Sequence, residues 1–538
     1  MVTLRGLILT AEHLPNGNGQ ESVPMSDCER NPPAAACPPT VEDLRRQAHE
    51  QLDGIIAYCA NDPGAASFLN FEMGLLELLR SLGCLLIQLF LRTRHDRLDP
   101  AAWQARGYRV ADPAAGRTLK TSCGPVAYVR AFLVPRHGGG PGVHPLDVAL
   151  GLTRDAYSPL LIGWFCRLAT RVSFQVASGL GEMFLGAAPP ASAIEEWVLG
   201  LARPAYVYLS EGPLPEGEGA VLVIEIDGKA VPTATEQELT RRRRPRTGHE
   251  QGCLCQRHRG RARRGRRGRK RRRKKGDKSK NGRSATLVVM YTLRRGGDGR
   301  LHGPIHKKVF GTFGSRRSAL DWARTQATRR GFPPGTAKTV QIVIDGETCL
   351  EQRLRRLFRG ATLTLDVRHA QEKLWEVGRL FHREGSRELA EWVGGLEELL
   401  YKGHVRALLG RLEQEIQGIS PRGPGTRQKR QVLTKVIGYL EARVKLMDYG
   451  RLRREDLVIA SGVVEGAARY VIGERLDNSG MRWIEERAEA VLLLRCIEVN
   501  GDWEDFTRWS QEQRSHDLER GEVVQIRSKT PTQIPQAA

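Results

Sequence analysis

Hydrophobic positions divide the chain into a helical first part and a later part in which strands alternate with helices. Apolar residues recur at helical spacing in VEDLRRQAHEQLDGIIAYC from Val41 and in FLNFEMGLLELLRSLGCLLIQLFL from Phe68, which predicts two amphipathic helices. A short extended stretch follows at TSCGPVAYVRAFLV. Three compact apolar segments then begin after Ser158, Ser173 and Ser192, and serine directly before such a segment favours a helix N-terminus.

The three compact helices predict either a helix-turn-helix or an ordinary helical bundle. Short helices joined by tight turns are typical of the DNA-binding motif. In a bundle, the aromatic residues Trp164, Phe174 and Trp197 would belong to the core. No spacing in this segment separates the two interpretations.

Two nearly unbroken apolar runs in the second part end in the same Asp-Gly pair. VLVIEIDG ends at Asp227-Gly228 and TVQIVIDG ends at Asp345-Gly346, as expected for strands that are buried on both faces of a sheet. Between them, SATLVVMYTL and HKKVFGTF predict further strands, and Ser315 begins a helix. ETCLEQRLRRLF then predicts a helix and ATLTLDVRH a strand. This order predicts a ribonuclease-H-like α/β core.

A glutamate lies among the apolar positions of a later helix, ASGVVEGAARYVIGERL. Ser461 is its expected N-cap, and Glu465 follows within the first turns. Gly462 and Gly466 flank the glutamate, and because glycine in a helix costs about 1 kcal/mol relative to alanine, the pair indicates close approach of backbone or ligand. The alternative is a surface ion pair of Glu465 with Arg469, worth about 0.3 to 0.5 kcal/mol.

Length and composition favour a multidomain cytoplasmic protein. A chain of 538 residues exceeds what one hydrophobic core supports and predicts about three or four domains. The longest apolar stretch, 75–91, is interrupted by Glu77, Arg80 and Gln88, so it predicts an amphipathic helix and not a membrane span. The N-terminus lacks a signal-peptide layout, and ten scattered cysteines suit a reducing compartment.

The net charge of +23 is concentrated in one segment. Between Arg241 and Arg283, 22 lysines and arginines stand against Glu250 and Asp277, a net +20. Such a run predicts a disordered arm that binds nucleic acid without sequence preference and with strong salt dependence; the alternative is a solvated linker. The expected DNA contacts in its densest part are Lys270, Arg271, Arg272, Arg273, Lys274, Lys275 and Lys278.

Five motifs follow one another between Val221 and about Phe506: VIEIDGKAV, KKGDKSKNGRSATLVVMYTL, VQIVIDGE, LDVRHAQEKLW and SGVVEGAARYVIGERLDNSGMRW. With them the segment resembles the DDE transposases of bacterial insertion sequences, most closely the Kra-type family. Residues 119–200 look similar as well. The resemblance implies a nucleoid-associated enzyme that binds the terminal repeats of a mobile element, cleaves the phosphodiester backbone and joins the 3′-hydroxyl to target DNA.

The resemblance also implies that Asp227, Asp345 and Glu465 are the three catalytic carboxylates. Two divalent ions stabilise the attacking and leaving oxygens of such a reaction, and hard oxygen ligands suit Mg²⁺, with Mn²⁺ as the alternative. In this hypothesis Asp227 bridges both ions, Asp345 completes one site and Glu465 the other. Because two element ends must be brought together, a homodimer or higher oligomer is expected, with DNA as partner and no membrane.

Other residues are weaker candidates. Asp366 and His369 form a D-x-x-H similar to the C/D-x-x-H element of Mutator-type transposases, which would place them and Arg469 near the site; the alternative for His369 is an ordinary core histidine. Trp392 resembles the tryptophan that some such enzymes stack on a flipped base, although a tryptophan on an amphipathic helix is more often core.

Zinc sites are weakly predicted. VPRHGGGPGVHPLD carries no cysteine before its P-L-D segment, so the metal ribbon of related transposases is not expected there. His249, Cys253, Cys255 and His258 are four candidate ligands in the basic arm, but Cys-x-Cys is tighter than ordinary zinc spacing.

The expected organisation has six parts: a disordered leader (1–40), a mainly helical N-terminal region (41–205), the first part of the core (218–375) interrupted by the basic arm (241–283), a helical insertion (376–450), the completion of the core (451–506) and a C-terminal tail (507–538). Two other functions stay open. One is a ribonuclease-H-like nuclease such as a junction resolvase, and the other is a DNA-binding protein without catalysis.

Overall fold

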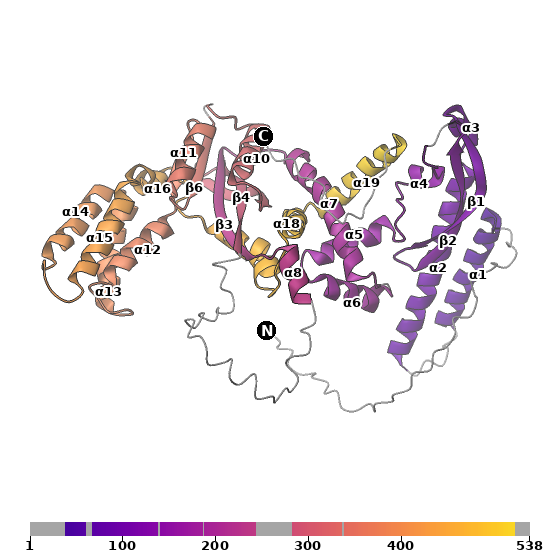
Figure 1. Cartoon of the computed structure of the whole chain (residues 1–538), viewed down its shortest axis with the longest axis horizontal. Coiled ribbons are helices and arrows are strands. Elements are labelled where there is room, and N and C mark those ends of the chain that lie inside the picture. The colour runs from indigo at the N-terminus through magenta and orange to yellow at the C-terminus, as the bar shows by residue number, and fades with distance from the viewer. Residues whose placement is uncertain are drawn as a thin grey trace, which may run out of the picture.

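A computed structural model describes residues 38–60, 67–137, 140–186, 188–243, 282–335 and 338–521. Its architecture is mixed α/β, with a central sheet between an N-terminal lobe and a helical lobe at the opposite end of the long axis (Figure 1). The expected leader and most of the basic arm lie outside the described residues.

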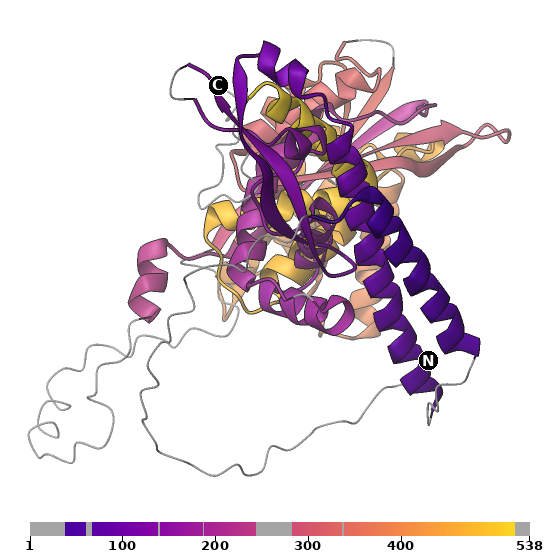
Figure 2. The same cartoon turned by 90° about the vertical axis from the view of Figure 1, so that its right-hand side faces the viewer.

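The N-terminal lobe combines a helical hairpin with a two-stranded sheet. Helix α1 (Val41–Ala60) lies beside α2 (Phe68–Asp96), and both project from the rest of the molecule (Figure 2). After α3 (Pro100–Ala105), strand β1 (Tyr108–Lys120) pairs antiparallel with β2 (Pro125–Pro135). The sequence indicated only β2. Strand β1 shows no alternation of apolar and polar residues because nearly all of it is exposed, with Leu119 its buried residue.

Three helices then connect this lobe to the sheet: α5 (Pro159–Ala169), α6 (Phe174–Leu185) and α7 (Ala191–Glu211), preceded by the short α4 (Pro145–Ala149). Ser158 and Ser173 cap α5 and α6 as predicted, whereas α7 begins after Pro190 and not after Ser192. Trp197 is fully buried as the bundle predicts, whereas Trp164 is 39% exposed and Phe174 is half-buried. Helix α6 carries no lysine or arginine that could read DNA. These features favour the bundle, with Trp164 outside its core.

The central sheet has the strand order β5-β4-β3-β6-β7. Strand β3 is antiparallel to β4, which is antiparallel to β5, while β6 and β7 run parallel to β3. The sequence predicted these five strands and the two helices between them. Their bounds are β3 (Val221–Pro232), β4 (Gly282–Arg295), β5 (Leu301–Thr312), α10 (Arg316–Arg329), β6 (Thr339–Ile344), α11 (Thr348–Leu357) and β7 (Thr362–Leu365).

Strand β3 continues beyond the point at which the sequence ends it. It pairs with β4 as far as Pro232, opposite Gly282, whereas its other neighbour β6 stops at Ile344. Asp227 therefore lies inside a strand and not at its end, at the level where the parallel side of the sheet finishes. Helix α8 (Glu236–Arg243) follows.

The helical lobe begins directly after β7 and comprises α12 (Val367–Gly378), α13 (Arg387–Tyr401), α14 (Val405–Gly418), α15 (Thr426–Glu441), the 3₁₀ turn η2 (Val444–Leu446) and α16 (Tyr449–Arg454). The chain then returns to the sheet through α17 (Gly462–Ala467), the π-helix η3 (Ala468–Asp477), α18 (Glu485–Val499) and α19 (Trp503–Glu519).

The expected C-terminal tail is wrong over its first residues. Residues up to Glu519 continue α19, which is anchored to the N-terminal lobe because Gln511 donates hydrogen bonds to the carbonyls of Leu150 and Gly151. Trp503 and Phe506 are buried on this helix. Two sequentially distant parts of the chain thus pack together, which no local pattern predicts.

Candidate functional site

Asp227 and Asp345 lie at the same level on neighbouring strands. From Val221 to Glu225, each residue of β3 is opposite the residue of β6 that comes 118 positions later, and the two aspartates keep this offset. Burial raises the pKa of Asp227, and the Asp345 carboxylate raises it further by repulsion, while the Gly228 amide, His369 and Lys229 lower it. The structure therefore brings these two predicted acids together, with His369 nearby.

Asp345 is exposed at the turn between β6 and α11. Its Oδ1 accepts a hydrogen bond of 3.0 Å from the Glu347 amide. The helical lobe holds the same turn, because the Tyr439 hydroxyl donates to the Asp345 carbonyl at 3.1 Å and Arg443 Nε donates to the Gly346 carbonyl at 2.6 Å. The second acid is thus fixed by residues almost one hundred positions downstream.

A buried glutamate that the sequence interpretation missed joins the sheet to α17. Glu225 Oε1 accepts from the Tyr291 hydroxyl at 2.6 Å, and Oε2 accepts from the Val464 amide at 2.7 Å. Burial raises its pKa, and the nearby carboxylates of Asp366 and Glu465 raise it further. A signal was available, since an acid two residues before Asp227 in an apolar strand lies on the same face of the sheet.

Glu465 lies in the first turn of α17, over the same face of the sheet, but it does not join Asp227 and Asp345 in a metal-binding group among the described residues. Since the Val464 amide is bonded to Glu225, α17 begins on the face of the sheet that carries Asp227. The Glu465 carboxylate lies 3.6 Å from Arg368 and is 41% exposed. The structure thus pairs it with Arg368 of α12 and not with the predicted Arg469, which is exposed.

The expectations about α17 are met only in part. Ser461 is the N-cap residue as predicted, but its side chain makes no capping hydrogen bond; its hydroxyl donates to Asp366 instead. A Cβ at Gly462 would meet nothing within 4 Å, and one at Gly466 would meet only the Tyr470 ring at 4.0 Å. These glycines face open space, and the close approach occurs at Gly473, where a Cβ would lie 2.9 Å from Lys229 Nζ.

The two residues of the D-x-x-H pair, Asp366 and His369, have different surroundings. Asp366 is fully buried and accepts from the Arg368 amide at 2.8 Å and from Ser461, so it ties the end of β7 to α12 and α17. His369 is 39% exposed with Nδ1 3.5 Å from Glu372, which excludes the core-histidine alternative. Its electrostatic effect on Asp227 places it at the rim of the site.

The arrangement matches a metal centre only in part. Carboxylates suit a hard divalent cation, and Asp227 and Asp345 are near one another on one sheet edge. In the part of the chain that the structure describes, no three His, Cys, Asp or Glu side chains lie close enough together to hold a metal ion. Glu465 would have to leave Arg368 to join the other two carboxylates.

The remaining candidates lie elsewhere. Trp392 Nε1 donates to Glu415 at 3.3 Å, and its ring packs near Phe381 and His382 inside the helical lobe, which favours a core role. The seven basic-arm residues from Lys270 to Lys278 and the four zinc candidates between His249 and His258 lie outside the described residues.

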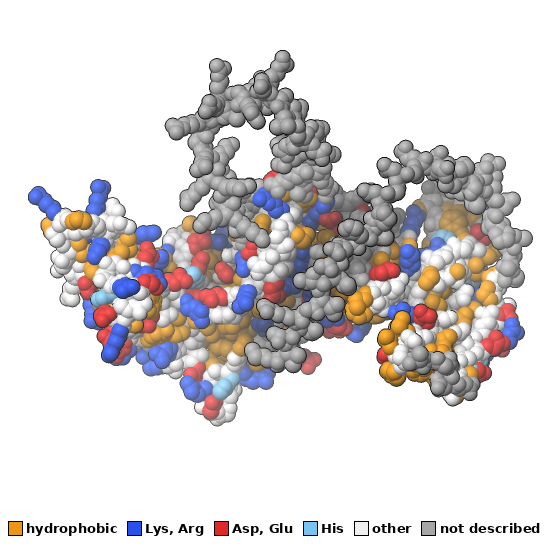
Figure 3. Space-filling view, turned by 90° about the horizontal axis from the view of Figure 1, so that it is seen from below, with side chains coloured by type: hydrophobic (Ala, Val, Ile, Leu, Met, Phe, Trp, Pro, Cys, Tyr) orange, Lys and Arg blue, Asp and Glu red, His pale blue; other side chains and the backbone are white. Residues whose placement is uncertain are grey.

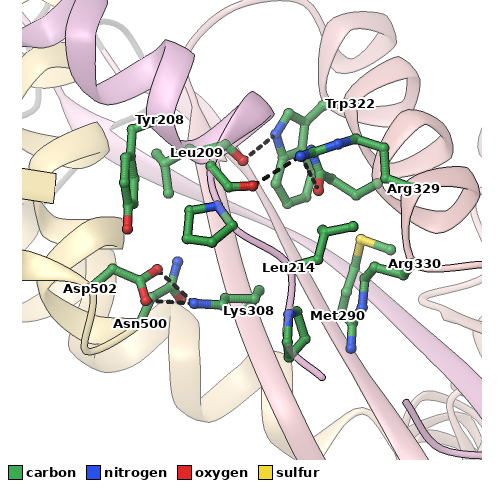
Figure 4. A pocket seen from close by; sticks show the side chains of 14 residues that line it. Tyr208, Leu209, Leu214, Met290, Lys308, Trp322, Arg329, Arg330, Asn500 and Asp502 are labelled. Atoms are coloured by element: carbon green, nitrogen blue, oxygen red, sulfur yellow. Dashed lines mark hydrogen bonds and ion pairs between the residues drawn. The ribbon is translucent and has the colours of Figure 1, made fainter. Parts of the chain in front are cut away.

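A small cavity on the opposite face of the sheet is structural. Its volume is about 40 Å³, and it lies between α7, α10 and the turn before α19 (Figure 4). Met290 lines it and alternates along β4 with Tyr291, which faces Glu225. Several polar groups around it are engaged: Arg329 donates to carbonyls at the end of α7, and Lys308 pairs with Asp502. Arg330 Nη1 is buried without a hydrogen-bond partner, whereas Nε and Nη2 of this arginine bond to Glu218.

Comparison with protein families finds no family model that matches the chain, and comparison with curated proteins finds no match. The assignment of the candidate site therefore rests on the geometry of its residues.

Proposed function

We propose that the protein is a metal-dependent DNA transposase of the three-carboxylate type, built on a ribonuclease-H-like core. The observation that carries the proposal is the placement of Asp227 and Asp345 at the same level of neighbouring parallel strands, where the Asp345 carboxylate helps to raise the pKa of Asp227. The strand order β5-β4-β3-β6-β7, antiparallel on one side of β3 and parallel on the other, supports this fold. Glu465, which α17 presents on the same face, would be the third acid.

The chain's own residues would prepare the site for two Mg²⁺ or Mn²⁺ ions. When bound, the cations would stabilise the charge on the attacking and leaving oxygens of the phosphodiester. Asp227 and Asp345 would hold them from the sheet edge, and their repulsion would be relieved by a cation between them. Glu465 would exchange Arg368 for the metal. The released Arg368 would then face the DNA, where a guanidinium binds phosphate well.

Asp227→Asn tests the proposal because it keeps the shape of the side chain and removes its charge. We expect it to abolish Mg²⁺-dependent cleavage and joining of end-labelled DNA that flanks the gene, while DNA binding stays within twofold of the natural protein. Asp298→Asn, an aspartate 49% exposed in the β4–β5 turn, is the matched control and should cleave normally. Near-normal cleavage by Asp227→Asn would remove this residue from the site.

The same assay separates the two other functions. Nicked products without joined products would indicate a nuclease or resolvase. Binding alone would indicate a DNA-binding protein without catalysis, which the pairing of Glu465 with Arg368 favours more than any other observation.

DNA and a second copy of the chain are the proposed partners, and the cytoplasm is the proposed compartment. Among the described residues, one helix, α2, is long and apolar enough to cross a membrane by length and composition. Part of this helix packs on protein, because Leu91 joins the small core that contains Leu119 and Val126 of the two-stranded sheet.

A further inference from the structure

Helix α2 exposes a continuous apolar stripe. Six side chains, here called the α2 seam, are each 48% to 63% exposed: Leu69, Met73, Leu76, Leu79, Leu86 and Phe90. They follow one another in steps of three or four residues, with Gly83 at the position between Leu79 and Leu86. This 3–4 spacing keeps side chains on one face of a helix and is typical of a coiled-coil contact.

Few side chains of the α1–α2 hairpin are buried. Only Leu44, Ala48 and Ile55 of α1 and Leu91 of α2 are buried. Between the two helices lies a groove of about 530 Å³, lined by residues such as Gln47, Gly54 and Tyr58. Helices gain most of their stability from packing of an apolar face, and large exposed apolar patches mark interaction sites.

The stripe offers a small protein interface. In an antiparallel pair centred on Leu76, the partner's α2 covers residues 68–84, so Leu69, Met73, Leu76 and Leu79 of the seam lie in the contact, together with Phe68, which is 75% exposed. These side chains bury on the order of 400 Å² per copy, the size of a weak interface, and Leu86 and Phe90 lie beyond it. Hydrophobic side chains gather on this lobe, at the right of the space-filling view (Figure 3).

The two charged residues beside the seam make it complementary to itself. Glu72 and Arg80 lie four positions before and after Leu76. If a two-fold axis passes through Leu76, an antiparallel second copy places Glu72 opposite the partner's Arg80, and Met73 opposite the partner's Leu79. Such an isologous contact is the commonest way in which identical chains pair. Arg80 also donates to the Phe184 carbonyl, and its guanidinium has five N–H donors for both contacts.

We propose that the α2 seam is a dimer interface, in which α2 packs antiparallel against α2 of a second copy of this chain with Leu76 at the axis. The proposal rests on the apolar stripe and its charges and not on the catalytic function proposed above. A monomeric protein could still cleave DNA, and a dimer could be inactive, so the two proposals fail separately.

Charge reversal in the full-length protein tests this geometry. Sedimentation equilibrium should show a dimer of the natural protein at micromolar concentration. Glu72→Arg and Arg80→Glu should each weaken dimerisation at least tenfold, because each places like charges opposite one another. The double variant should restore it to within threefold of the natural protein. Glu42→Arg, at a charge on α1 that is 80% exposed and lies outside the seam, is the matched control and should leave the dimer unchanged.

A second variant and a second measurement guard against misfolding. Leu76→Lys should also give a monomer while circular dichroism stays unchanged, since the side chain is 48% exposed. A monomeric natural protein, or a double variant that stays as weak as the single variants, would overturn the proposal. If a monomeric natural protein instead floats with vesicles of phosphatidylethanolamine and phosphatidylglycerol, the seam belongs to a membrane surface and the proposal is equally wrong.

Discussion

The ion pair between Arg368 and Glu465 determines how readily the Glu465 carboxylate can bind a cation. Their side chains are 62% and 41% exposed and lie 3.6 Å apart, so water screens the pair and its contribution is below about 1 kcal/mol. An exposed ion pair of this kind orients the carboxylate, but breaking the pair costs little free energy. A divalent cation near Asp227 and Asp345 therefore competes with a weak partner for Glu465.

Arg368→Gln should consequently strengthen metal binding. We expect the Mn²⁺ affinity, measured by electron paramagnetic resonance of free Mn²⁺, to rise by up to about fivefold, the factor that 1 kcal/mol allows. Arg451→Gln removes an arginine that is 41% exposed and pairs with Asp448 and Glu455 at the two ends of α16, and it should leave the affinity unchanged. A loss of affinity in Arg368→Gln would show that the arginine supports the site instead of competing for it.

Glu489 gives the protein a pH-dependent stability. It is buried on α18, where the Thr312 hydroxyl and the Phe313 amide donate to it, and burial raises its pKa from 4.5 to about 7. Because the folded pKa lies above the unfolded one, the contribution of this group is fully present below about pH 4.5 and is lost as the pH rises through 7. The difference corresponds to roughly 3 kcal/mol.

Glu489→Gln should remove that dependence. Glutamine keeps only one of the two acceptor oxygens that Thr312 and Phe313 use, so the variant should be less stable than the natural protein at pH 5. Between pH 5 and pH 8 the natural protein should lose roughly 3 kcal/mol of unfolding free energy relative to the variant, measured by urea denaturation at both values. Equal pH dependence in the two proteins would show that Glu489 does not titrate in this window.

At the scale of elements, the helical lobe fixes the turn that carries Asp345. The turn after β6 is held by α15 and the turn that follows it, since Arg443 donates to Gly346 and stacks 3.9 Å from the Tyr439 ring centroid. Gly346 has φ +87°, and a Cβ there would lie 2.7 to 2.8 Å from Leu365, Arg443 and Tyr439. The glycine therefore serves both the backbone conformation and the docking of the helical lobe.

Gly346→Ala should separate these two requirements when it is compared with Gly360→Ala. Gly360 has a similar φ of +83° but open space around it, so its substitution adds only the backbone strain of about 1 to 3 kcal/mol. We expect Gly346→Ala to cost more, and to increase hydrogen exchange in α15 and in the Asp345 turn, whereas Gly360→Ala should not. Similar exchange in both variants would mean that the lobe does not depend on this contact.

The same contacts mark the limit of prediction from the sequence. Apolar runs and turn residues predicted all five strands of the sheet and placed Asp227 and Asp345 in it, because strand periodicity is a local property. Strand β1 was missed since its residues are exposed, and the support of Asp345 by Tyr439 and Arg443 has no local signature. No backbone approaches the glycines at 462 and 466, and glycine, which also occurs at open positions, does not by itself indicate a crowded one.

At the scale of the whole molecule, the basic arm joins the sheet at the end that carries Asp227. Asp227 is opposite Leu287 on β4, and the last residues of the arm, 282–283, already belong to β4. On the other side, the first residues of the arm, 241–243, end helix α8. Both connections therefore lie at the end of the sheet that carries Asp227, so DNA held by the arm would be brought to the three carboxylates.

Replacing the six cations from Lys270 to Lys275 with glutamine should weaken DNA binding without changing the chemistry. The logarithm of the binding constant falls linearly with the logarithm of salt concentration, with a slope of about 0.9 per phosphate neutralised, so the slope should decrease by up to about 5. Cleavage should drop at low DNA concentration and recover at saturating DNA, because the site itself is unchanged. If cleavage stays absent at saturating DNA, the arm takes part in the reaction, and if the salt slope does not change, the arm does not contact DNA.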